Sequence, residues 1–236
     1  MPYFIARVWV PDRPGALGAV ASRIGAVRGD LVGIDILERG GGRAIDELVI
    51  SLPDASLVSL LVSEIGEVDG VDVEDIRPAT ESLIDPRLDA LETAASLVAK
   101  QQIPDLLEAL ARRAAADFQA DWAVVLDLES SGPERPSGRR PVGLSSVGPV
   151  PPTTWLQAFI AGSRASTGFG TDPTGPDDVA WTDLAAADLV VVLGRRGRPW
   201  RARERRQLTA LARIVDQRWS DLVAKTTREL HPSRAR

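Results

Sequence analysis

The chain has 236 residues and a formal net charge of −5, with no cysteine and a single histidine. The lack of cysteine excludes disulfides, zinc–thiolate sites, iron–sulfur clusters and thiol nucleophiles. His231 is the sixth residue counted back from the end of the sequence, where chains commonly fray, so we expect neither a serine–histidine hydrolase nor a histidine-based metal site. The composition therefore favours a protein that is not an enzyme and that carries no cofactor or metal.

Residues 1–78 predict one small domain that begins with a strand over residues 3–10. Side chains of a strand alternate between the two faces of a sheet. One face takes Phe4, Ala6, Val8 and Val10, and the other takes Tyr3, Ile5, Arg7 and Trp9. The following helix places its apolar residues at helical spacing, and Gly29 is expected to end it in a left-handed conformation. These residues are Leu17, Val20, Ala21, Ile24 and Val27.

A hairpin, a second helix and a fourth strand complete this domain. We expect strands over residues 31–38 and 44–52, joined by the glycines at 40–42. An amphipathic helix over residues 57–65 and a strand over residues 71–77 follow. The resulting order, βαββαβ with two helices on one face of the sheet, predicts a ferredoxin-like domain.

The turn between the first strand and the first helix, "VPDRPGALG" at residues 10–18, is the candidate binding site. Pro14 fits the first turn of a helix, where its missing N–H costs nothing, and Gly15 lets a ligand approach the backbone. The amides of Gly15, Ala16 and Leu17 would lack acceptors and would lie at the positive end of the helix dipole. They can hold a carboxylate, and Asp12 can accept a hydrogen bond from an ammonium group, so the turn suits a zwitterion. The alternative is structural, with Asp12 capping the helix and Pro14-Gly15 only making the turn.

The stretch "DRPGALG" after a strand, within a βαββαβ unit of this length, resembles the ACT domain family. This resemblance implies a regulatory module that binds amino acids between two paired copies. It implies ligand contacts from Asp12, Arg13, Pro14, Gly15, Ala16 and Leu17 and from the start of the second strand, Leu31, Val32 and Gly33. Leu31 stands where amino-acid-binding members often carry asparagine. The implied partners are a small-molecule ligand, with an amino acid expected, and a second copy of the chain.

After a linker at residues 79–87, residues 88–225 predict a second domain, with a polar tail at residues 226–236. Two helical stretches meet at Ile103-Pro104. Six further elements are expected after these helices. They are, in chain order, a strand over residues 122–129, a loop over 130–143, a short helix opened by the capping pair Thr154 and Gln157, a loop over 168–178, a strand over 188–194 and a long helix over 201–229. This order resembles a GAF-type domain. The whole chain is thus predicted to be α+β: an N-terminal ferredoxin-like ACT-type domain plus a C-terminal α/β GAF-like domain with long flanking helices.

The GAF-like part shows no cysteine for bilin attachment and no cyclic-nucleotide pattern, so we interpret it as a degenerate copy that serves output or dimerisation. Two other functions remain open: a ligand-free scaffold that works through protein partners, and nucleic-acid contact through residues 195–206. That segment has seven arginines and one glutamate, but the acidic chain disfavours nucleic acid as a partner. No apolar run reaches the length of a membrane span and no secretion signal is recognised, so we expect a cytoplasmic protein without a membrane partner.

Overall fold

The computed structural model describes residues 1–79, 86–127, 143–166 and 178–230, and it divides into two compact units. The N-terminal unit contains Met1–Asp89 together with Arg201–Arg203, and the C-terminal unit contains Ala90–Trp200 together with Glu204–Arg236. Three predicted segments lie largely outside the described residues. They are the linker at 79–87, the loop at 130–143 and the loop at 168–178, of which one residue is described. None of the helices in the described ranges combines the length and the apolar character needed to cross a membrane.

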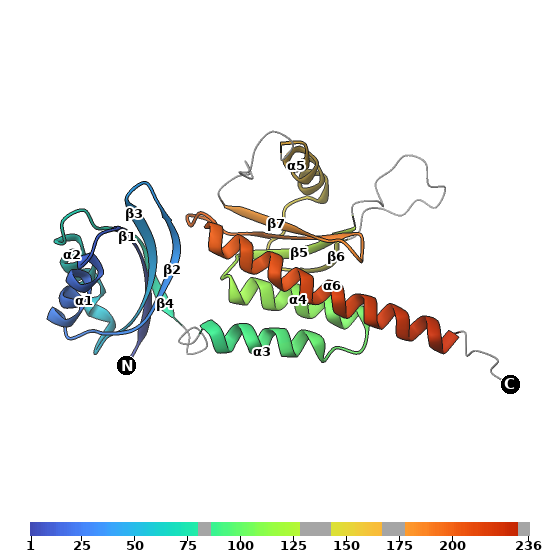
Figure 1. Ribbon diagram of the computed structural model, residues 1–236, viewed down its shortest axis with the longest axis horizontal. Helices are drawn as coiled ribbons and strands as arrows, with labels where there is room; N and C mark the ends of the chain where they lie inside the picture. Colours follow the sequence, from blue (N-terminus) through green and yellow to red (C-terminus); the bar gives the residue numbers. More distant parts are fainter. Residues whose placement is uncertain (80–85, 128–142, 167–177, 231–236) are drawn as a thin grey trace. The chain divides into compact units, whose positions relative to one another are not determined.

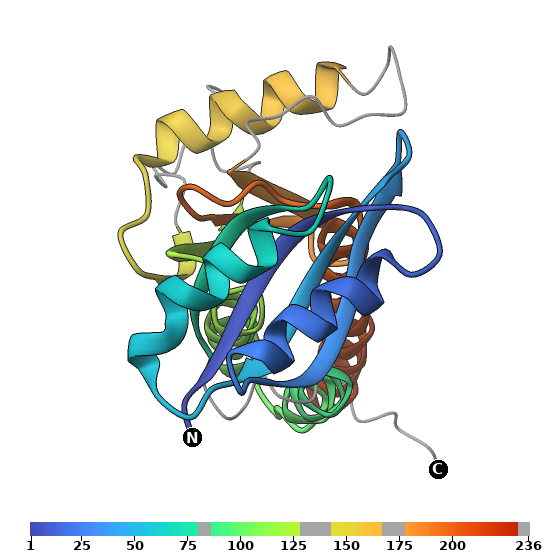
Figure 2. The same ribbon diagram turned by 90° about the vertical axis from the view of Figure 1, so that its left-hand side faces the viewer.

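The N-terminal unit has the predicted order of elements. These are β1 (Tyr3–Pro11), α1 (Ala16–Ala26), β2 (Asp30–Gly40), β3 (Arg43–Ser51), a 3-10 turn (Ala55–Leu57), α2 (Val58–Gly66) and β4 (Asp72–Ala79). All neighbouring strands are antiparallel, in the sheet order β2-β3-β1-β4. Both helices lie on the same face of this sheet (Figure 2), which confirms the ferredoxin-like arrangement.

The face of β1 that was predicted to be apolar forms the core beneath the two helices. Phe4, Ala6, Val8 and Val10 pack there with Val20 and Ile24 of α1, Leu48 and Ile50 of β3, and Leu61 and Ile65 of α2. The β2–β3 hairpin closes through Gly41 and Gly42, whose φ angles of 60° and 76° form a type I′ turn. The alternating pattern of β1 thus predicted correctly which face the helices cover.

The end of α1 differs from the prediction in one residue. Arg28, not Gly29, takes the left-handed conformation, with φ of 59°. The amide of Gly29 donates to the carbonyl of Ile24 and that of Arg28 to the carbonyl of Gly25, as in a Schellman motif. Gly29 is needed for space, because a Cβ there would lie 3.0 Å from Cγ2 of Ile24 and 3.1 Å from Cδ2 of Leu52.

The C-terminal unit is a second antiparallel sheet with helices on both faces. Its elements are α3 (Pro86–Val98), α4 (Ile103–Asp117), β5 (Trp122–Asp127), β6 (Gly143–Val147), α5 (Thr153–Ser166), β7 (Val179–Leu184), β8 (Leu189–Gly194) and α6 (Ala202–Leu230). The strand order is β6-β5-β8-β7. α4 and α6 lie on one face of this sheet and α5 lies on the other (Figure 1).

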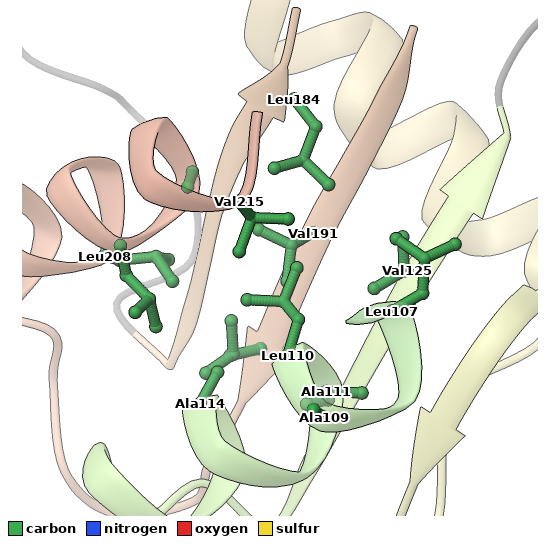
Figure 3. Close-up of a cluster of buried hydrophobic side chains, with 14 of the residues drawn as sticks. Leu107, Ala109, Leu110, Ala111, Ala114, Val125, Leu184, Val191, Leu208 and Val215 are labelled. Carbon is green, nitrogen blue, oxygen red and sulfur yellow. The ribbon is translucent and has the colours of Figure 1, made fainter. Parts of the chain in front are cut away.

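Two layers of apolar side chains fill this unit. Between α4, α6 and the sheet, Leu110, Val125, Val191, Leu208 and Val215 point toward one another (Figure 3). On the opposite face, Leu156 and Ile160 of α5 pack on Val124, Val190 and Val192. The four helices and the strands β5 and β8 lie where the sequence predicted them.

Two local predictions for this unit were wrong. β6 and β7 were missed, and they are the two edge strands of the sheet. Thr154 cannot be the N-cap of α5, because the helix already begins at Thr153. The predicted interruption near Ile103-Pro104 is confirmed, since α3 ends at Val98 and α4 begins at Ile103 with Pro104 in its first turn.

Candidate functional site

The candidate site begins with the turn that joins β1 to α1. The amide of Ala16 donates to the carbonyl of Arg13 at 3.3 Å, so residues 13–16 form a β-turn with Pro14 and Gly15 at its centre. Gly15 has φ of 85° and ψ of −14°, which are the values of the third residue of a type II turn. Pro14 therefore presets the turn, and it precedes the N-cap residue Gly15 instead of lying in the first helical turn as predicted.

The N-terminus of α1 has no side-chain cap. Within the described part of the chain, the first intrahelical bond runs from Ala19 to the carbonyl of Gly15, and the amides of Leu17 and Gly18 find no backbone acceptor. An ideal Cβ on Gly15 would meet no atom within 4 Å. Free amides next to open space are therefore present at Leu17 and Gly18, because a glycine N-cap has no side chain with which to fill that space. The amide of Ala16, which was predicted to be free, is bonded to the carbonyl of Arg13.

Asp12 and Arg13 lie at the rim of this turn. Both are exposed, and the backbone amide of Asp12 donates to the carbonyl of Gly42 at 2.9 Å, which ties the turn to the β2–β3 hairpin. The ion pair that Arg13 makes among the described residues is with Asp69, at 3.9 Å. Because Asp12 does not cap α1, its carboxylate is available to a ligand.

The predicted contacts from β2 lie elsewhere in the same chain. Leu31 pairs with Ile50 near the end of β3, whereas the turn adjoins Arg43 at its beginning. Seven residues of extended strand separate these points by about 23 Å. Val32 stands in a β-bulge on this edge strand and is exposed, and Leu31 and Gly33 are half-buried. One chain thus brings Asp12, Arg13, Pro14, Gly15, Ala16 and Leu17 together, but not with Leu31, Val32 and Gly33.

Sequence reasoning missed Asp46 on β3. It pairs with Val8 of β1 and Ile36 of β2, and it shares its face of the sheet with Leu48 and Ile50 beneath the helices. Asp46 is only 4% exposed, and its Oδ1 has no hydrogen-bond partner in the described structure. The signal was present in "AIDELVISL", where one acidic residue interrupts an alternating row of apolar ones.

The electrostatic surroundings of Asp46 connect it to the turn. Burial raises the pKa of the Asp46 carboxyl, and Arg39 acts in the opposite direction. The negative charges of Asp12 and Asp35 raise the pKa of Asp46 further. Among the described residues, Asp46 is therefore a buried acid without an ion-pair partner, and its charge interacts with that of Asp12 in the turn.

The opposite face of the same sheet carries a compact ion network. Oε1 of Glu47 accepts from Arg7 at 2.7 Å and 3.0 Å and from Arg77 at 2.8 Å. Arg77 also donates to Asp75 at 2.8 Å. Burial alone would raise the pKa of Glu47, but the Arg7 and Arg77 guanidiniums outweigh it and hold that pKa below its usual range. The network satisfies its own charges, so it fits a structural role.

The arginine-rich segment uses several of its guanidinium groups inside the C-terminal unit. Arg195 is buried, donates to the carbonyls of Phe118 and Arg198 and to Glu204, and stacks on Trp200. Arg198 donates to the carbonyl of Gln119 at 2.6 Å. These two residues hold the turn after β8, so they are not positioned as ligands for phosphates.

An open cavity of about 350 Å³ lies near the end of β8 in the C-terminal unit. Trp122, Trp155, Asp178 and Arg196 are among the residues that line it. The amide of Arg196 donates to Asp121, and Trp155 stacks on Phe159 with ring centroids 5.5 Å apart. Aromatic and charged side chains therefore both border this cavity.

Comparisons with known proteins give little beyond this geometry. No family model and no curated protein matches the chain. Among solved structures, a formyltetrahydrofolate deformylase from Pseudomonas putida KT2440 matches with 14% identity and a TM-score of 0.27. The match covers 41% of this chain and 38% of the deformylase chain. A likeness this low assigns no function to the chain.

Proposed function

We propose that the chain is a non-enzymatic regulatory protein that binds an amino acid at the first turn of α1. One observation carries this proposal: the N-terminus of α1 has no cap, and Gly15 leaves open space beside it. A carboxylate bound there would accept hydrogen bonds from main-chain amides at the positive end of the helix dipole. The exposed Asp12 at the rim can interact with the positive group of a zwitterion.

A second copy of the chain would complete this site. Leu31–Gly33 lie about 23 Å from the turn in one chain, so a site that includes both needs β2 from another chain. β2 is an edge strand, and its Val32 and Ile34 are 42% and 46% exposed. Antiparallel pairing of two such edges makes an isologous dimer with a twofold axis. This arrangement agrees with the resemblance of the turn and the βαββαβ order to ACT domains.

The C-terminal unit would transmit or stabilise the paired state. Its sheet, covered by α4 and α6 on one face and α5 on the other, is compatible with the proposed GAF-like module. A ligand that bound the dimer more tightly than the monomer would shift the population toward the dimer. The output of such a shift would be read by a protein partner of the C-terminal unit.

Thermal unfolding with each of the twenty amino acids tests the proposal. A true ligand at a hundred times its Kd stabilises the folded state by about 2.7 kcal/mol, which is a shift of several degrees. Gly15→Asp should abolish the shift, because it places a negative charge where the ligand carboxylate would lie. Gly15→Asn should also abolish the shift, since an asparagine N-cap tolerates the positive φ and its side-chain oxygen accepts from the same amides. Asp188→Asn, at an exposed turn of the C-terminal unit, is the control and should shift as wild type does. A shift that persists in both Gly15 variants, or no shift with any amino acid, would refute the proposal.

The alternative is a scaffold that pairs through β2 without any ligand. The exposed Val32 and Ile34 on the edge strand favour this reading, because apolar edges promote association by themselves. Analytical ultracentrifugation with and without amino acids separates the two. A dimer whose association constant is the same in both conditions would favour the scaffold.

A further inference from the structure

Asp46 is out of place in a purely structural account of the N-terminal unit. It occupies an inward position in a row with Ala44, Leu48 and Ile50, where an apolar residue would pack against the helices. Oδ1 of Asp46 is buried without a hydrogen-bond partner in the described structure, and such an oxygen destabilises a fold because it does not recover the hydration that it loses on leaving water. A residue that costs stability at such a position is expected to serve binding.

The position of Asp46 relates it to the turn. Val10 at the end of β1 pairs with Ala44, and Asp46 follows two residues later on the same face. The same end of β3 is fastened to the turn, because the amide of Asp12 donates to the carbonyl of Gly42. Asp12 also acts electrostatically on the Asp46 carboxyl. The unpartnered oxygen thus belongs to the end of the helix-covered layer at which α1 begins.

We propose that the Asp46 carboxylate accepts the ammonium group of the amino acid whose carboxylate binds the free amides of α1. This inference rests on the proposed function and assigns the residue that receives the free amino group of its ligand. The two receptors have opposite charge, as a zwitterion requires. The ammonium would also provide Asp46 with the cation that it lacks among the described residues. The corresponding 2-hydroxy acids and N-acetylated amino acids would lose the positive charge of this contact and keep at most a neutral hydrogen bond.

The charged groups around Asp46 are consistent with this role. Arg39 on β2 is exposed and forms no ion pair in the described structure, and Asp12 and Asp35 are the negative neighbours that act on the carboxyl. The surroundings of Asp46 thus carry two negative charges and one positive charge. Such an imbalance attracts a cationic group to the carboxyl and disfavours a second anion at the same point.

Isothermal titration of wild type and of Asp46→Asn tests the assignment. The probes are the amino acid that gives the largest thermal shift with wild type and its 2-hydroxy analogue. Asp46→Asn should weaken the amino acid at least tenfold and leave the weaker binding of the 2-hydroxy acid unchanged. Asp188→Asn, the same change at an exposed turn of the C-terminal unit, is the control and should bind as wild type does.

The outcomes separate this inference from the proposed function. If Asp46→Asn binds the amino acid as tightly as wild type while Gly15→Asp does not bind it, the site stands and the role of Asp46 is refuted. If no amino acid binds wild type, both proposals fail. Should Asp46→Asn not fold, Asp46→Ser takes its place, and failure of both variants to fold would show that Asp46 is structural and overturn the inference.

Discussion

Asp46 and Glu47 are neighbours on β3, yet they meet opposite environments on the two faces of one sheet. Glu47 accepts three hydrogen bonds from two arginines, and the pKa of its carboxyl lies below the usual range. Asp46 lies among apolar side chains without a partner at Oδ1, and burial raises its pKa. The same chemical group thus stabilises the fold on one face and strains it on the other. The difference suggests that only the satisfied carboxylate is there for the sake of the fold.

The largest expected effect comes from removing the satisfied group. Glu47→Ala leaves Arg7, which is fully buried, without its main partner, and we expect a loss of about 3 kcal/mol in the free energy of unfolding. Chemical denaturation at neutral pH measures this loss. Folding lowers the pKa of Glu47. Its contribution to the free energy of unfolding is therefore complete above the ordinary glutamate pKa, and it is lost as the pH falls through the pKa of Glu47 in the folded state. If Glu47→Ala were as stable as wild type at neutral pH, Glu47 would not stabilise the fold, and its difference from Asp46 in stability would disappear.

The next effect has the opposite sign. Asp46→Val replaces the unpartnered carboxyl with a branched apolar side chain suited to a strand, and we expect a gain of about 1–2 kcal/mol at neutral pH without ligand. Folding raises the pKa of Asp46. The loss of stability that its charged carboxyl causes is therefore complete above the pKa of Asp46 in the folded state, and it disappears below the ordinary aspartate pKa. The advantage of the variant should therefore shrink as the pH is lowered, as denaturation at several pH values would show. A destabilised Asp46→Val would mean that the carboxyl supports the fold.

The smallest effect tests the link between Asp46 and the turn. Asp12→Asn removes one negative charge that acts on Asp46, at an exposed position where substitutions change stability by less than about 0.5 kcal/mol. The pKa of Asp46 should move down toward its ordinary value, and an NMR titration of its side-chain carboxyl would detect the shift. An unchanged titration would separate Asp46 from the turn and weaken its assignment as a ligand residue.

Sequence patterns predicted the N-terminal unit more completely than the C-terminal one. The alternation of β1 and the helical spacing of α1 each lead to a single buried face, so the pattern alone decides their burial. β6 and β7 were missed because they are short edge strands, with five and six residues, and edge strands need no continuous apolar run. Trp181, Thr182 and Asp183 of β7 are all at least partly exposed, so their pattern resembles that of a loop.

In the candidate site, the sequence predicted the turn at residues 12–17 but not Asp46 on β3. Residues 12–17 are contiguous, so the preferences of Pro14 and Gly15 suffice to form the turn and leave the helix without a cap. The sequence offered Asp12 two roles, cap or ligand acceptor, and only the folded turn showed that it is not the cap. The burial of Asp46 became evident only from the pairing of β3 with β1 in the sheet.

The sequence by itself determined which segments become strands and helices in the N-terminal unit and where the turn of Asp12 to Leu17 lies, because these depend on near-neighbour sterics and on the alternation of apolar residues. Only the tertiary structure decided that Asp46 is buried without a partner and that Glu47 beside it is fully paired. Such partners come from strands far apart in the chain, and the register that brings Arg7 or Val8 opposite a given residue is fixed only when the sheet assembles.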